Sequence, residues 1–188
     1  MKIGVYVGSF NPVHKGHIAI ANYIVDNNYV DKLLIVPTGN YWDKNNNIDL
    51  TLRIKMLEKY ENDKIIVERE FNSSKYTYEL FRKLKERYPN DELYLIIGAD
   101  NIISFDKWMN YNELLEYGLI IYNRDGIDIK PYLNKLNKTE KYFILNDAPK
   151  YDISSTKIRE AINKYYSLYD MIDIEILNII LENNLYKN

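Results

Sequence analysis

The only two histidines of this 188-residue chain, His14 and His17, stand three positions apart in the segment GSFNPVHKGH. Gly8, at its start, lets a ligand approach the backbone closely, and Asn11-Pro12 turns the chain away from helix. If a helix begins at the histidines, its first N–H groups and both imidazoles can converge on one anion. The alternative is that one histidine caps the helix and the other packs. Their confinement to this turn favours a phosphate site.

A second candidate anion site lies late in the chain, in the segment ISSTKIR that begins at Ile153. Ser154, Ser155 and Thr156 are residue types that begin helices, and Arg159 falls one turn inside the expected helix, on a face that can reach a ligand. Caps, helix dipole and guanidinium together can make a phosphate site. Taken singly, however, this segment is better explained by capping alone, with Arg159 in solvent.

Two more candidate residues come after the apolar run at 93–97. Asp100, just beyond Gly98, can accept hydrogen bonds from ribose hydroxyls, or it can cap a helix. Trp108 lies in a polar stretch, where an indole serves as a stacking platform or packs in the core. The residue types alone leave both pairs of alternatives open.

Several familiar kinds of site are excluded by the sequence. It contains neither the G-x-G-x-x-G dinucleotide fingerprint nor a P-loop. With no cysteine and two histidines, a zinc site would have only carboxylates as further ligands, so we expect no protein metal site. The net charge of -2 predicts no nucleic-acid partner. No apolar run approaches the roughly 20 residues of a membrane helix, and we expect a cytoplasmic protein.

The elements that must position these residues alternate along the chain. Short apolar runs typical of buried parallel strands cover 3–7, 33–36, 65–67, 93–97, 119–122 and 142–145. Stretches of helical period cover 17–27, 50–60, 78–87, 155–165 and 174–182. The alternation predicts one α/β domain over residues 1–188, with a doubly wound parallel sheet and helices on both faces. Ligands of such sheets bind beyond the carboxyl ends of the strands, where the candidate residues lie.

Together, the two segments resemble the [HT]-x-G-H and I-S-S-T-x-x-R motifs of the nucleotidylyltransferase superfamily, which has a Rossmann-like fold. Within it, the chain is similar nearly end to end to the bacterial nicotinate-nucleotide adenylyltransferases. The shared features also include Pro37 with Lys44, Arg53 in LRIKML, Thr77 in KYTYEL, and the segments LIIGAD, KWMNYNELL and ILENNLY. Val7 stands where the family often has a second glycine.

The resemblance implies an enzyme that joins ATP to nicotinate mononucleotide, giving deamido-NAD and pyrophosphate in NAD biosynthesis. It implies catalytic roles for His14, His17 and Arg159, and Mg²⁺ carried on the ATP phosphates. The implied acceptor-binding residues are Thr77, Trp108 and Lys44, with the loop at 43–47 closing over the acceptor. The implied ATP-binding residues are Gly8, Ser9, Phe10, His14, His17, Gly98, Asp100, Ile153, Ser154, Ser155, Thr156 and Arg159.

The acceptor and the oligomeric state stay open at this point. The same chemistry could act on nicotinamide mononucleotide, on phosphopantetheine, or on a phosphorylated alcohol with CTP as donor. A nucleotide-binding module without turnover is a further alternative, although it would not need the intact histidine pair and Arg159. We expect small-molecule partners only, no membrane partner, and leave a homo-oligomer open.

Overall fold

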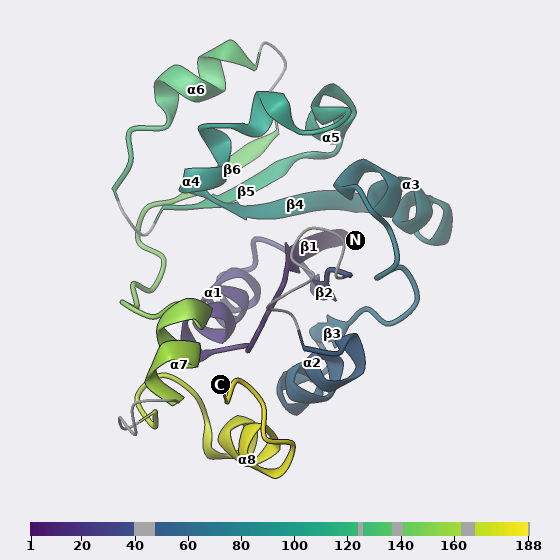
Figure 1. Ribbon diagram of the computed structural model, residues 1–188. Coiled ribbons are helices and arrows are strands. Elements are labelled where there is room, and N and C mark those ends of the chain that lie inside the picture. Colours follow the sequence, from purple (N-terminus) through teal and green to yellow (C-terminus); the bar gives the residue numbers. More distant parts are fainter. Residues whose placement is uncertain (40–47, 124–125, 137–140, 163–167, 188) are drawn as a thin grey trace.

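The structure is a computed structural model that describes residues 1–39, 48–123, 126–136, 141–162 and 168–187. It contains a six-stranded sheet of order β3-β2-β1-β4-β5-β6 (Figure 1), in which every neighbouring pair is parallel. The strands are β1 (Lys2–Gly8), β2 (Lys32–Pro37), β3 (Ile65–Val67), β4 (Glu92–Gly98), β5 (Leu119–Tyr122) and β6 (Tyr142–Leu145). The expected Rossmann-like parallel sheet is confirmed.

Helices pack against both faces of this sheet, as expected. The helices are α1 (Lys15–Asp26), α2 (Leu50–Leu57), α3 (Thr77–Arg87), α4 (Ala99–Ile102), α5 (Tyr111–Tyr117), α6 (Lys130–Lys135), α7 (Ser155–Ile162) and α8 (Ile174–Glu182). Buried residues of α1, α2, α7 and α8 join one apolar cluster, and those of α3, α4, α5 and α6 join a second. Within the described ranges, no helix is both long and apolar enough to cross a membrane.

The strands are apolar on both sides because each side meets a layer of helices. In β1, Ile3 and Val5 belong to the cluster under α3 to α6, whereas Tyr6 belongs to the cluster under α1. In β4, Leu95 belongs to the cluster under α3 to α6, and Ile96 belongs to the cluster under α1. This double burial explains why the strands were readable as short, continuous apolar runs.

Some helix boundaries differ from the expected ones. The first helix begins at Lys15 rather than at 17, because His14 caps it. The helix expected over 50–60 ends at Leu57 and continues as a 3-10 turn, η1 (Glu58–Tyr60). The helix expected over 155–165 is described as far as Ile162, and its last residues lie outside the described ranges.

Four short elements were not expected at all. They are α4, α5, α6 and a second 3-10 turn, η2 (Phe105–Lys107). The longest of them has 7 residues, and about two turns of helix are too few for a periodic apolar pattern to show. Three of the four, α4, η2 and α5, connect β4 to β5 and carry the chain past one edge of the candidate site.

The strand order reverses between β1 and β4, which is the position where sheets of this type bind ligands. Both strands end in glycine, Gly8 and Gly98. A side chain at position 98 would collide with the carboxylate of Asp100. Glycine at this position lets the Asp100 carboxylate lie against the end of β4.

Candidate functional site

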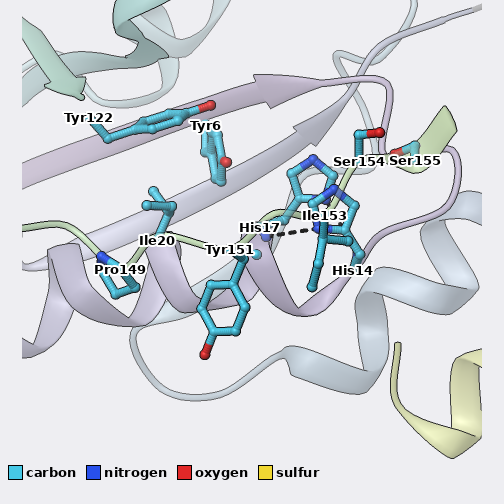
Figure 2. Close-up of a pocket in the computed structure, with 11 residues that line it drawn as sticks. Tyr6, His14, His17, Ile20, Tyr122, Pro149, Tyr151, Ile153, Ser154 and Ser155 are labelled. Carbon is cyan, nitrogen blue, oxygen red and sulfur yellow. Dashed lines mark hydrogen bonds between the residues drawn. The ribbon is translucent and has the colours of Figure 1, made fainter. Parts of the chain in front are cut away.

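The two histidines form a reciprocal cap at the start of α1. The backbone N–H of His17 donates to Nδ1 of His14 at 3.4 Å, and the backbone N–H of His14 donates to Nδ1 of His17 at 3.3 Å. The rings are stacked, with centroids 3.6 Å apart (Figure 2). Because each Nδ1 accepts a hydrogen bond, each neutral ring carries its hydrogen on Nε2. The pair thus caps the helix through its Nδ1 atoms, and the hydrogen of each ring lies on Nε2.

The turn before the histidines is built on a buried aromatic ring. Phe10 has a φ of 46°, which is uncommon for a residue with a large side chain, and its ring is almost completely buried. The ring makes edge contacts with Tyr6 and His17, with centroids 5.4 and 4.9 Å away. Since its side chain is in the core, Phe10 can meet a nucleotide only through its backbone.

The late segment is bonded directly to this turn. Ser155 Oγ donates to the carbonyl of Pro12 at 2.9 Å, and Arg159 Nη1 donates to the carbonyl of Asn11 at 2.6 Å. Arg159 Nη2 also reaches Thr156 Oγ1 at 3.1 Å. The alternative in which Arg159 stands in solvent is therefore wrong. Two segments separated by more than 140 positions form one structural unit.

A cavity of about 170 Å³ opens between α1 and the start of α7 (Figure 2). Five of the predicted site residues line it: His14, His17, Ile153, Ser154 and Ser155. Sequence reasoning had not identified its tyrosines, which are Tyr6, Tyr122 and Tyr151. The volume of the cavity is below the roughly 300 Å³ at which pockets hold a whole ligand.

A buried arginine holds the ends of β1 and β2 together. The side chain of Arg53, in α2, is fully buried, and its Nη1 donates to the carbonyls of Ser9 and Thr38, both at 2.8 Å. Its Nε donates to the carbonyl of Ile48 at 3.3 Å. Burial lowers the pKa of the Arg53 guanidinium from its usual value. Sequence reasoning used Arg53 only as a point of resemblance and assigned it no role.

The carboxyl-terminal segment also reaches the phosphate turn. The hydroxyl of Tyr186 donates to Oδ1 of Asn11 at 2.7 Å, and Asn11 itself is buried. Burial raises the pKa of the Tyr186 phenol above its usual value, so the hydroxyl stays protonated as a donor. Asn11 is thus held by Tyr186 through its side chain and by Arg159 through its carbonyl.

A second, larger cavity of about 560 Å³ lies beyond the ends of β1 and β2. Thr77, the first residue of α3, and Trp108, directly after η2, both line it. The Trp108 ring also packs on Phe105, with centroids 5.1 Å apart, so it is partly a core residue and partly a wall of the cavity. Lys44 and the loop at 43–47 lie outside the described residues.

The two cavities lie on opposite faces of β1. Tyr6 lines the smaller cavity and Val7 the larger, and successive residues of a strand point to opposite faces. Val7, where the family often has glycine, thereby forms part of the wall of the larger cavity. Asp100 is exposed in the first turn of α4 and is not among the described lining residues of either cavity. Its ribose-binding role stays a prediction.

Comparison with known proteins agrees with this geometry. The sequence profile of the cytidylyltransferase-like family matches residues 5–161. A "probable nicotinate-nucleotide adenylyltransferase" of Clostridium tetani is 32% identical over 99% of both chains, and one of Flavobacterium johnsoniae is 33% identical over 100% of both. The structure of Plasmodium falciparum nicotinic acid mononucleotide adenylyltransferase complexed with NaAD matches with a TM-score of 0.81 and 25% identity, covering 98% of this chain and 97% of that one. The protein described here belongs to the nicotinate-nucleotide adenylyltransferase family.

Proposed function

We propose that this protein transfers the adenylyl group of ATP to nicotinate mononucleotide, forming deamido-NAD and releasing pyrophosphate. Its family supports this reaction, and a solved relative is complexed with NaAD, the product. The observation that carries the proposal is the pair of hydrogen bonds from Ser155 to Pro12 and from Arg159 to Asn11. They join the two candidate phosphate-binding helix starts at one end of the sheet. Because the reaction draws on ATP, we propose a cytoplasmic location.

In the proposed reaction, a phosphate oxygen of nicotinate mononucleotide attacks the α-phosphorus of ATP. A new P–O bond forms, the bond from the α-phosphorus to the bridging oxygen breaks, and pyrophosphate leaves with the electron pair. No protein nucleophile is needed, so the protein acts by positioning and by stabilising charge. We assign this stabilisation to the Nε2–H donors of His14 and His17.

The remaining donor residues hold the rest of ATP in this proposal. Ser155, Thr156 and Arg159 bind the β- and γ-phosphates, which depart together. Ile153 and Ser154 line the same cavity as the histidines. The backbones of Gly8, Ser9 and Phe10 contact the ATP nucleotide at the end of β1. Asp100, which lies beyond Gly98, binds the ribose.

Mg²⁺ enters the proposed reaction as part of the substrate, bound to the ATP phosphates. The side chains assigned to the ATP phosphates are imidazoles, hydroxyls and a guanidinium, which bind phosphate oxygens, whereas Mg²⁺ prefers oxygen anions. Among the described residues, no group of three or more histidine, aspartate or glutamate side chains is placed to hold a metal ion. The substrate phosphates supply the oxygen ligands instead.

The larger cavity supports an acidic acceptor. Its volume of about 560 Å³ lies within the roughly 300–1,000 Å³ of small-molecule sites. Lys75 and Lys107 line it together with Thr77 and Trp108, and its described lining residues include no aspartate or glutamate. The positive charge of the two lysines favours nicotinate mononucleotide, whose ring bears a carboxylate, over nicotinamide mononucleotide. The acceptor would meet ATP at the end of β1, between the two cavities.

The function is tested by measuring pyrophosphate release with ATP or CTP against a panel of acceptors. The panel holds nicotinate mononucleotide, nicotinamide mononucleotide, phosphopantetheine and phosphorylated alcohols. We expect the largest kcat/KM for ATP with nicotinate mononucleotide, with deamido-NAD as the product. Absence of release with ATP and either pyridine mononucleotide would contradict the proposal.

Replacing Trp108 by alanine is expected to raise the KM for the acceptor about tenfold, because stacking of a base-like ring on an aromatic side chain contributes about 1–3 kcal/mol. The KM for ATP should change little. Trp108→Phe keeps an aromatic face and should retain most of the affinity. Steady-state kinetics with each substrate varied in turn provide the measurement. An unchanged KM for the acceptor would show that Trp108 is a core residue alone.

A further inference from the structure

Asn72, in the segment between β3 and α3, has a buried amide group without a hydrogen-bond partner. The residue is only 3% exposed, and neither Nδ2 nor Oδ1 has a partner among the described residues. Because both atoms are unpaired, the observation does not depend on which way round the amide is placed. Buried polar groups are nearly always paired, and an exception points to a partner supplied from outside the fold.

The position of Asn72 is set by rigid neighbours. Glu68 Oε1 accepts the backbone N–H groups of Glu70 and Phe71, at 2.7 and 3.2 Å. Arg87 donates to Glu68 Oε2 at 2.6 Å, and its guanidinium lies 4.0 Å from the centroid of the Phe71 ring. The ion pair and the stacked ring hold the backbone directly before Asn72. The unpaired amide therefore sits in a segment with a defined conformation.

Asn72 also lines the 560 Å³ cavity proposed for the acceptor. The ends of β1 and β2 form one wall, where the acceptor phosphate must lie to reach ATP. Asn72 lines the same cavity as Thr77 and Trp108, which the proposed function assigns to the pyridine nucleotide. A pyridine ring stacked on Trp108 would therefore lie in the cavity that Asn72 lines.

Another buried asparagine shows what a structural role looks like in this fold. Asn123, after β5, is 5% exposed, and both polar atoms of its amide are hydrogen-bonded. Its Oδ1 accepts the N–H of Ile127 and its Nδ2 donates to the carbonyl of Ile127, both at 2.9 Å. Asn123 closes a turn with its own amide, whereas Asn72 makes no such bond among the described residues.

We propose that Asn72 is an acceptor-binding residue that determines specificity, its amide N–H donating to the ring carboxylate of nicotinate. This inference rests on the proposed function. A hydrogen bond from an amide to a carboxylate is charge-assisted, so it is stronger than the bond the same amide makes to a neutral carboxamide. Asn72 thereby adds to the preference for nicotinate over nicotinamide that the positive charges of Lys75 and Lys107 create.

The test compares Asn72→Leu with Asn123→Leu, two replacements of buried asparagine by a side chain of similar size. Asn72→Leu should raise the KM for nicotinate mononucleotide at least about tenfold, as expected for loss of a bond to a charged group. The KM for ATP should stay unchanged. The melting temperature of the free protein should not fall, because the replacement removes an unpaired polar group. Asn123→Leu should instead lower the melting temperature and leave the KM for the acceptor unchanged.

The ring carboxylate is tested by calorimetric binding of deamido-NAD and NAD, which differ only in the ring substituent. Asn72→Leu should weaken binding of deamido-NAD by a larger factor than binding of NAD. Equal weakening of both, or an unchanged KM for the acceptor, would overturn the inference, and so would a loss of stability like that of Asn123→Leu. If the wild-type protein forms no deamido-NAD, it is the proposed function that fails.

Discussion

Replacing His17 by alanine is expected to lower kcat at least about 100-fold while the KM for ATP stays within a factor of about three. A preorganised donor aimed at charge that develops in the transition state contributes most to the chemical step and little to binding. In the structure, the hydrogen bond to Nδ1 of His17 leaves Nε2–H as the donor, which fits that role. Single-turnover measurement of adenylyl transfer gives the chemical rate directly.

The control for this prediction is His17→Asn. His17 is the third residue of α1 and completes the reciprocal cap with His14, so alanine removes a cap together with an imidazole. The Oδ1 of asparagine can replace Nδ1 as acceptor of the N-cap N–H, but asparagine has no donor at the position of Nε2. We expect His17→Asn to be as slow as His17→Ala. If asparagine restored kcat, or if only the KM for ATP rose in the alanine variant, His17 would act through capping or ground-state binding.

Replacing Arg53 by methionine is expected to lower the free energy of unfolding by about 3 kcal/mol or more. Methionine fills much of the space but leaves the carbonyls of Ser9, Thr38 and Ile48, which bond the buried guanidinium, without the donors that Arg53 supplies. Each unpaired buried group costs about 1–3 kcal/mol. For a chain of this size the melting temperature should fall by roughly 6–12 °C, measured by calorimetry.

A surface arginine provides the matched control. Arg82 forms an exposed ion pair with Glu113, and exposed pairs contribute little to stability. Arg82→Met should leave the melting temperature almost unchanged. Arg53→Lys should lie between the two, because an ammonium group cannot bond three separate carbonyls in the geometry of a guanidinium. If Arg53→Met were as mild as Arg82→Met, the three carbonyls would not depend on Arg53.

Much of the fold could be predicted because its signals are local. The run 65–67 and the later runs 119–122 and 142–145 coincide with β3, β5 and β6. Strands buried on both sides must be apolar throughout, and that pattern shows in four or five residues. The same holds for the helix start at His14 and His17, where residue type and spacing already predict a cap or an anion site.

The candidate site could be predicted only in part. Five residues expected at ATP line the smaller cavity, and Thr77 and Trp108 line the larger one. The sequence contained no sign that Arg53 bonds three loop carbonyls or that Tyr186 reaches Asn11. Every residue has a backbone carbonyl, whatever its type. A side chain that donates to carbonyls therefore leaves no pattern of residue types in the sequence.

By itself, the sequence determined which elements form and which side chains can meet phosphate. Propensity, periodicity and turn chemistry act over a few residues, and two distant motifs could be recognised without knowing where they meet. Only the tertiary structure decided that Ser155 and Arg159 bond to the turn at Asn11 and Pro12. It also left the amide of Asn72 buried and unpaired. Both facts depend on how packed elements bring remote backbone together, and no local interaction encodes that.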